Sequence, residues 1–329
     1  MIGVEMAERF MYFRIESNLI TYLTGPLGQS TMMAAENMNV WTGTTALLLV
    51  VGALVADSFL GCYKTLVVAS AMYVLGLGLL TLSAMLPFDC QNTKKIITWC
   101  SPDQFQLMLF LFSIYVVAVA QSGHRPCVQA LGADQFDGQN PEECKSKSSF
   151  FNWWGFGICV GAFSTRLILN YIQDNLSWAL GFGIPCIAMV LALLVFFLGT
   201  NTYRFSIKST FVRIGQVFIA VIRNWRTTTT TPSAMVVGEE LESSTFLNKA
   251  LIARLDGSNE YQNVCRCSIN DVEDAKALLS IVLICTTSLV YGIVTAQSAT
   301  FFTKQGVTID RAITPGFDIS AASLQFNPL

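Results

Sequence analysis

The sequence predicts an all-α membrane protein from two observations, its composition and the length of its apolar runs. Its 329 residues are 53% hydrophobic and only 13% charged, with a mean hydropathy of +0.51, whereas a soluble domain has about 25% charged residues. A helix needs about 20 largely apolar residues to cross about 30 Å of hydrocarbon, and only helices or closed barrels satisfy their backbones in lipid. Six stretches meet this length: residues 40–60, 65–86, 105–128, 149–172, 178–199 and 276–301.

A further candidate span at the start of the chain, approximately residues 1–24, differs from these six because it carries charge. It contains Glu5, Glu8, Arg9, Arg14 and Glu16, and each charge at mid-membrane costs about 2.5–3.5 kcal/mol. We therefore expect this segment to insert only beside partner helices. The alternative is an exposed amphipathic end that never crosses the membrane.

The spans divide the chain into four regions. We expect an N-terminal transmembrane bundle of six helices over residues 1–199, a cytoplasmic linker over 200–275, a seventh transmembrane helix over 276–301 and a polar tail over 302–329. The linker side carries twelve of the basic residues in the connectors and the opposite side four. The positive-inside rule then makes the linker side cytoplasmic, although the long linker itself contributes most of the difference.

The first part of the linker is predicted to form a basic amphipathic helix. Apolar residues recur there at helical spacing, whereas Arg213 and Arg223 lie off that face. This pattern is typical of a helix that lies on the inner leaflet, and a helix buried against protein is the alternative. The apolar residues are Phe211, Ile214, Phe218, Val221, Ile222 and Trp225.

Polar side chains of the first span fall on one face of the expected helix. At about 100° per residue they lie within a sector about 100° wide, whereas Arg14 falls on the opposite side. Carboxylates inside a membrane beside an arginine can exchange a proton against an ion pair when water access changes. The stripe therefore indicates a proton-coupled function. Its members are Glu5, Glu8, Arg9, Tyr12 and Glu16.

A second intramembrane charge, Arg125, comes near the end of the span over 105–128. Pro126 follows it and removes a backbone donor, which kinks or loosens a helix. Arg125 is therefore a candidate counter-ion for Glu5 or Glu8, and an arginine that reaches the inner headgroups is the alternative. We expect His124, the single histidine, to lie at the membrane interface.

Composition and cysteine spacing argue against several classes of function. The 20 basic residues are balanced by 22 acidic ones, so no nucleic-acid partner is expected. The ten cysteines contain no C-x-x-C pair and there is one histidine, so we expect no metal and no cofactor. With no nucleophile motif and no glycine-rich phosphate loop, we expect no enzyme. Cys90 and Cys100 share one polar connector and would form a disulfide only if it faces an oxidising compartment.

At Glu5-Met-Ala-Glu8-Arg9 the sequence shows an E-x-x-E-R motif, and further stretches accompany it along the chain. With them the chain resembles the plant nitrate and peptide transporter branch of the proton-dependent oligopeptide transporter family. These stretches together are highly specific. They are residues 18–28, 56–61, 132–137, 149–154 and 171–175, with Ala296, Gln297, Phe301 and Phe302.

The resemblance implies the major-facilitator fold, in which two six-helix bundles alternate access to a central cavity. This chain would contain the N-terminal six-helix bundle plus the seventh helix. The resemblance also implies that Glu5, Glu8 and Arg9 couple protons, with Arg125 as their partner where the family usually has lysine. We expect Tyr12, Glu16 and Gln297 to face the substrate cavity.

The sequence departs from the family's pattern in residues and in length. Arg14 and Glu16 stand where the family usually has glycine and alanine, and Thr295 occupies the place of a histidine found in nitrate-handling relatives. Binding of nitrate through a protonated histidine is therefore not expected. The chain also stops at Leu329, so we expect either a protein truncated after the seventh helix or a partner polypeptide that supplies the rest.

The function expected from these features is proton-coupled transport of small peptides or related small solutes. The expected partners are the lipid bilayer, protons and the solute. The chain would cross the plasma membrane or the vacuolar membrane several times. A seven-helix receptor or another non-transporting membrane protein is the alternative, but the charged stripe and the long connector before the last helix disfavour it.

Overall fold

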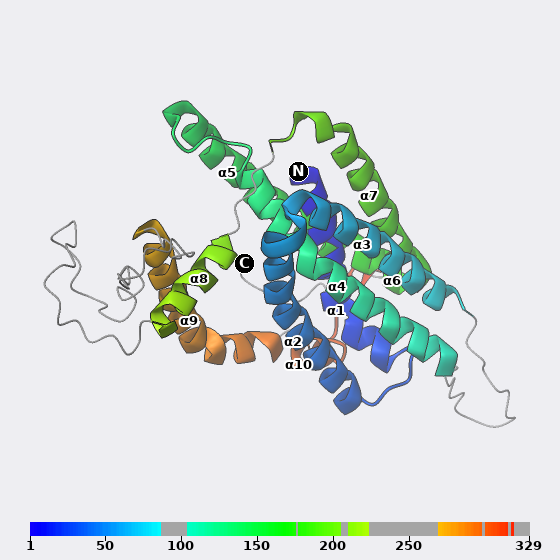
Figure 1. The fold of residues 1–329 in the computed structure, drawn as a ribbon. Coiled ribbons are helices and arrows are strands. Elements are labelled where there is room, and N and C mark those ends of the chain that lie inside the picture. Colours follow the sequence, from blue (N-terminus) through cyan, green and yellow to red (C-terminus); the bar gives the residue numbers. More distant parts are fainter. Residues whose placement is uncertain are drawn as a thin grey trace, which may run out of the picture. The chain divides into compact units, whose positions relative to one another are not determined.

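The computed structural model describes residues 1–86, 104–175, 177–204, 210–223, 269–297, 300–314 and 317–318. The described residues are nearly all helical, and six helical runs in them are long and apolar enough to cross a membrane. This confirms the fold class expected from the sequence. The chain divides into two compact units, residues 1–207 with 293–329 and residues 208–292, and each is described by itself (Figure 1). Cys90 and Cys100 lie outside the described residues.

The first unit is a bundle of helices that starts with the charged segment. Its helices are α1 (Ile2–Thr24), α2 (Thr31–Val55), α3 (Cys62–Met85), α4 (Gln104–Ala133), α5 (Pro141–Ser164), α6 (Asn170–Asn175) and α7 (Trp178–Leu198). Two short π-helical segments, η1 (Ala56–Leu60) and η2 (Thr165–Leu169), continue α2 and α5, and a short 3₁₀ turn, η3 (Thr200–Thr202), follows α7.

Local sequence signals set the ends of these helices. Ser30 and Ser177 cap α2 and α7 by accepting the backbone N–H groups of Met33 and Ala179, as N-cap serines do. Asn140 caps α5, and Pro141 follows at the first helical position, where its missing N–H is not needed. Gly61 separates η1 from α3 with φ of 76°, a left-handed conformation that glycine adopts without strain.

Helix α1 lies inside the bundle and packs against α2, α5, α7 and η2. More than half of its residues are buried, including Glu5, Glu8 and Arg14. The alternative of an exposed amphipathic end is therefore wrong, because neighbouring helices cover the charged segment. By contrast, many large apolar side chains of α2, α3, α5 and α7 are exposed on the outside of the unit, which is the pattern of a surface that faces lipid.

Close contacts between helices fix the height of α4 in the bundle. A Cβ atom on Gly52 of α2 would lie 2.1 Å from the carbonyl oxygen of Ser122 in α4, so only glycine permits this approach. A Cβ atom on Gly123 would meet Thr65 and Ala69 of α3 at 3.0 and 3.3 Å. These contacts place the next two residues of α4, His124 and Arg125, toward the interior of the helical bundle.

The second unit consists of α8 (Thr210–Arg223) and most of α9 (Ile269–Ala296). Ile214, Val217 and Val221 of α8 pack with Val272 and Ala275 of α9 in a small buried cluster. The predicted amphipathic helix thus forms, but part of its apolar face is covered by protein rather than left for lipid, whereas Ile222 is 69% exposed. Trp225 lies outside the described residues.

Helix α9 begins at Ile269, ahead of the apolar stretch expected to start at residue 276. The extra turns contain Asp271, Glu273 and Asp274, and acidic residues stabilise a helix near its N-terminus. Beyond α9, the first unit is completed by α10 (Phe301–Gly306) and a two-stranded antiparallel sheet of β1 (Ala312–Thr314) and β2 (Phe317–Asp318). Lys304 of α10 donates to the Thr24 hydroxyl at the end of α1.

Candidate functional site

The polar stripe of α1 forms a cluster of two carboxylates and two guanidinium groups, which we call the Glu8 cluster: Glu5, Glu8, Arg9 and Arg125. Arg9 Nε lies 2.8 Å from Glu5 Oε1 and 3.5 Å from Glu8 Oε2. Arg125 Nε, from α4, lies 3.3 Å from Glu8 Oε1. Both carboxylate side chains are excluded from solvent, at 1% and 0% exposure, while the two arginines retain 14% and 18%. The structure therefore brings together all four residues assigned to proton coupling.

The charges of this cluster balance, and this balance matters in a buried site. Taking ions out of water costs several kcal/mol per ion, so a buried charge persists only with close opposite charges and hydrogen bonds. Adding a proton to either carboxylate would leave a net positive charge and remove one ion-pair partner. The ion pair between α1 and α4 is therefore sensitive to a single proton.

Arg125 is held by groups on three sides rather than extended to the headgroups. Its guanidinium carbon lies 4.1 Å from the centre of the Tyr12 ring, a cation–π geometry. In the amide orientation that suits its neighbours, the Gln121 oxygen lies 3.0 Å from Arg125 Nε. The alternative that Arg125 only reaches the membrane surface is therefore wrong, because Glu8, Tyr12 and Gln121 engage it inside the bundle.

Two further residues of the site come from inside apolar spans: Tyr73, which the sequence analysis did not single out, and His124, which it placed elsewhere. Tyr73 of α3 donates its hydroxyl to Glu8 Oε1 at 3.0 Å. His124 is fully buried, with its ring edge-on to Tyr73 at 5.5 Å between ring centres. The expectation that His124 lies at the interface is wrong, because α3 covers it. A tyrosine near the middle of an apolar span was the available signal, since a buried hydroxyl needs a partner.

The residues expected in the substrate cavity divide into two groups. Tyr12 and Glu16 are neighbours one turn apart on α1, and the Tyr12 hydroxyl donates to Glu16 Oε1 at 3.3 Å. Gln297 follows α9 and contacts Thr300. Its backbone carbonyl accepts the Thr300 N–H at 3.2 Å, and its side-chain oxygen accepts the Thr300 hydroxyl at 3.3 Å. The structure therefore brings Tyr12 and Glu16 to the Glu8 cluster through Arg125, whereas Gln297 contacts a different part of the unit.

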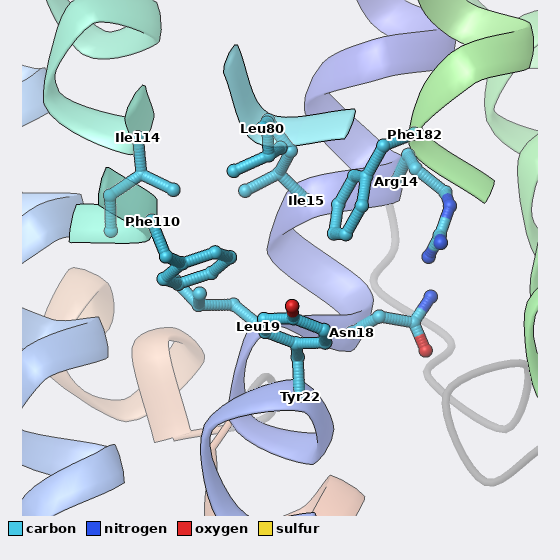
Figure 2. Close-up of a pocket in the computed structure, with 9 residues that line it drawn as sticks. All are labelled: Arg14, Ile15, Asn18, Leu19, Tyr22, Leu80, Phe110, Ile114 and Phe182. Carbon is cyan, nitrogen blue, oxygen red and sulfur yellow. The ribbon is translucent and has the colours of Figure 1, made fainter. Parts of the chain in front are cut away.

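Arg14 lies on the other side of α1, as its place opposite the stripe predicts. Its Nε donates to the Gly181 carbonyl of α7 at 3.2 Å, and its guanidinium lies 5.2 Å from the centre of the Phe182 ring. Figure 2 shows Arg14 and Asn18 on one side of a small cavity whose other walls are Tyr22 and apolar side chains. That cavity has a volume of only about 10 Å³, roughly the space of one water molecule, so it is too small for a solute.

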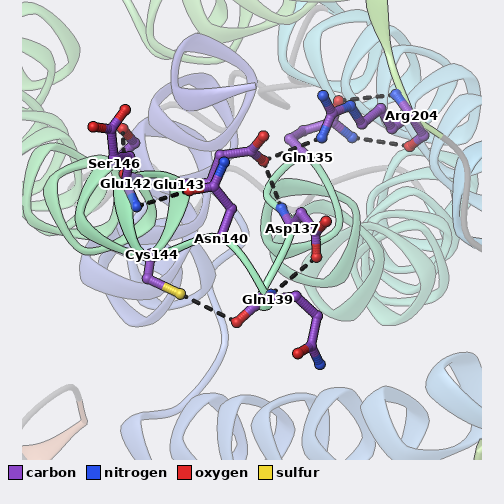
Figure 3. A network of polar contacts seen from close by, with 10 residues as sticks. Gln135, Asp137, Gln139, Asn140, Glu142, Glu143, Cys144, Ser146 and Arg204 are labelled. Carbon is purple, nitrogen blue, oxygen red and sulfur yellow. Dashed lines mark hydrogen bonds and ion pairs between the residues drawn. The ribbon is translucent and has the colours of Figure 1, made fainter.

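The connector after α4 forms a polar network with the residues that follow α7 (Figure 3). The Gln135 side chain exchanges two hydrogen bonds of 3.0 Å with the backbone of Arg204, and Arg204 pairs with Glu143 at 3.1 Å. The Asp137 carboxylate accepts the Gln139 N–H at 3.0 Å. These contacts order the connector.

Comparison with known proteins decides the family. The model of the POT family (PTR2) matches residues 63–329. The chain belongs to the POT family. It is 57% identical over 334 residues to the protein NRT1/PTR family 5.10 of Arabidopsis thaliana, covering 98% of this chain and 58% of the relative. It is 50% identical over 336 residues to the protein NRT1/PTR family 5.13 of the same plant, again covering 98% of this chain and 58% of the relative.

Solved structures of POT transporters share the fold. A crystal structure of the POT family transporter PepTSo matches with a TM-score of 0.66 at 18% identity, over 98% of this chain and 64% of that one. A crystal structure of an autoinhibited POT family peptide transporter matches with a TM-score of 0.64 at 18% identity, again over 98% and 64%. The expected multi-pass membrane class and the expectation of no enzyme are confirmed by the family, and the receptor alternative is not supported.

Proposed function

We propose that this chain forms the proton-coupling bundle of a transporter that moves small peptides or related small solutes together with protons. The observation that carries the proposal is the position of Glu8, buried between Arg9 of its own helix and Arg125 of α4. A buried carboxylate that links two helices through an ion pair can take up one proton and thereby weaken that link. Membership of the POT family supports this interpretation.

In this mechanism Glu8 is the switch and Arg125 is the fixed charge. Arginine stays protonated in proteins, so Arg125 cannot release the pair by losing its own proton. Protonation of Glu8 removes the carboxylate charge, after which Arg125 keeps its contacts with Tyr12 and Gln121 and can attract an anionic group of a solute. Glu5 and Arg9 would hold the neighbouring turn of α1 in place through their ion pair of 2.8 Å.

The polar face of α1, together with Arg125 of α4, offers contacts for both ends of a dipolar solute. Arg125 supplies a cation and Glu16 a carboxylate, with the Tyr12 ring between them. A small peptide carries a carboxylate and an ammonium group, so this order of charges suits it. We keep Tyr12 and Glu16 as proposed cavity residues, and Gln297 as a proposed contact from the segment after α9.

The remaining parts of the cavity are proposed from the length of the relatives. The chain spans 58% of the length of each of these two Arabidopsis thaliana relatives, NRT1/PTR family 5.10 and 5.13. We propose that a second bundle, equivalent to the rest of those relatives, faces the Glu8 cluster and completes the cavity. The membrane would be the plasma or vacuolar membrane.

The test is uptake of a labelled dipeptide into liposomes with an inward proton gradient. Two proteins are compared: the 329-residue chain alone, and a fusion of it to the C-terminal part of the 57% identical relative. We expect the fusion to accumulate dipeptide and to lose accumulation with an uncoupler. Glu8→Gln should abolish accumulation and keep exchange, whereas Glu142→Gln, at an exposed carboxylate in the first turn of α5, should change neither.

The outcomes separate the parts of the proposal. Absence of gradient-driven uptake by both proteins, for dipeptides and for other small solutes, would contradict the proposed function. Full accumulation by the Glu8→Gln fusion would remove Glu8 from the coupling mechanism.

A further inference from the structure

Tyr73 contacts the carboxylate that the proposed mechanism uses, although it lies on a third helix. Its side chain is 1% exposed, and its hydroxyl donates to Glu8 Oε1 at 3.0 Å. The helices α3 and α4 pack closely along their length, so Tyr73 and Arg125 approach the same oxygen from neighbouring helices. A neutral donor and a cation therefore share Oε1.

The two donors differ in what they require of Glu8. Arg125 binds through charge, and most of that attraction is lost when the carboxylate becomes neutral. A tyrosine hydroxyl can donate to a carboxylate and also to the carbonyl oxygen of a protonated carboxyl group. The hydrogen bond from Tyr73 can therefore persist in both protonation states.

The second oxygen of Glu8 has a different environment. Oε2 is buried and has no hydrogen-bond donor among the described residues, and its ion-pair contact with Arg9 Nε is longer, at 3.5 Å. The two oxygens of one carboxylate are thus distinguished by their partners. Oε1 is occupied by donors, and Oε2 has an unused acceptor site.

We propose that Tyr73 is a positioning residue for proton uptake at Glu8. Its hydroxyl holds Oε1 in both states, so that the proton is taken up and released at Oε2. The proposal rests on the proposed function, which it extends from α1 and α4 to α3. It requires no group beyond those of the chain: the proton adds to Oε2, the carboxylate charge disappears, and the Tyr73 O–H bond stays intact.

The surroundings of the pair limit what else can change with pH. Among the described residues, the titratable or charged groups facing Glu8 are Glu5, Arg9 and Tyr12 of α1, Tyr73 of α3, and His124 and Arg125 of α4. The His124 ring packs edge-on against the Tyr73 ring with an interplanar angle of 85°. Removal of the Tyr73 hydroxyl alone leaves this ring contact in place.

Infrared difference spectroscopy of the purified chain in lipid nanodiscs tests the proposal without a transport assay. The stretching band of the protonated Glu8 carboxyl is assigned by its loss in Glu8→Gln and followed as pH is lowered. In Tyr73→Phe the carboxylate loses a hydrogen bond that favours its charged form, so we expect the midpoint to move upward by about one pH unit. The band should also move to higher frequency, because the carbonyl loses its donor.

Tyr63→Phe is the matched control. Tyr63 lies on the same helix, and its hydroxyl bonds the Thr200 hydroxyl at 3.1 Å, away from Glu8. We expect this variant to leave both midpoint and frequency unchanged. Unchanged values in Tyr73→Phe as well would overturn the proposal and leave Tyr73 as a packing residue, with the function proposed above unaffected. A carboxyl band that persists in Glu8→Gln would instead contradict proton uptake by Glu8, and with it both proposals.

Discussion

The two faces of α1 each hold a buried arginine contact, and they differ in the partner. On one face Glu8 pairs with Arg9 and Arg125, so the partner is a group that can gain or lose a proton. On the other face Arg14 binds a backbone carbonyl and an aromatic ring of α7, and neither changes charge. A buried charge in a membrane helix therefore indicates a switch only when its partner is titratable. Under the function proposed above, the Glu8 face responds to protons, while the contacts of Arg14 with α7 hold the helices together.

The largest expected effect is a loss of stability without a loss of transport when Arg14 is replaced. In the fusion protein, Arg14→Met should lower the free energy of unfolding by about 2–4 kcal/mol, because a charged hydrogen bond and a cation–π contact are lost. Gradient-driven uptake per folded molecule should stay within about twofold of the unchanged fusion. Thermal unfolding in detergent and uptake normalised to folded protein provide the two readouts. Loss of coupling by folded Arg14→Met protein would erase the distinction between the faces.

A smaller effect is expected when Arg125 is replaced by the residue usual in the family. Arg125→Lys keeps the positive charge beside Glu8 but loses the planar group stacked near the Tyr12 ring. We expect uptake to persist and the fusion to lose about 1 kcal/mol of stability, as the cation–π contribution suggests. Arg125→Gln, which removes the charge, should instead abolish accumulation. Equal uptake by the two variants would mean that charge at this position is not needed.

The smallest effect concerns an arginine–carboxylate pair at the surface of the first unit. Arg204 and Glu143 lie 3.1 Å apart, but the Arg204 side chain is 63% exposed. Such pairs contribute about 0–1 kcal/mol, so Glu143→Gln should leave thermal stability and uptake close to those of the unchanged protein. A loss as large as that of Arg14→Met would show that the connector network in Figure 3 supports the bundle more than its exposure suggests.

The sequence predicts most of the fold because membrane helices are long and uniform in composition. The apolar runs locate α2, α3, α4, α5, α7 and α9, and helical spacing alone separates Arg14 from the stripe of Glu5, Glu8 and Arg9. The start of α9 at Ile269 is not predicted by the sequence, because the first turns of this helix are polar and their helical state depends on local charge.

The sequence predicts the polar stripe of α1 and its partner Arg125 of α4, but not the contacts of Tyr73 and His124. Glu8 and Arg125 were linked because both are charges in apolar spans, where opposite charges must meet. Tyr73 and His124 were missed or misplaced because their roles depend on which face of α3 meets α4. That register is set by close contacts such as Gly123 with Thr65, and no pattern in one chain encodes such a contact directly.

The most direct test of the central claim is a double-mutant cycle on the free energy of unfolding of the fusion protein, with Glu8→Gln, Arg125→Gln and the double variant. If Glu8 and Arg125 form the ion pair that protonation releases, the losses are not additive, and the double variant is no less stable than either single variant, because each single change leaves one buried charge without its partner. Losses that add would show that Glu8 and Arg125 act separately, and would contradict the proposed coupling through this pair.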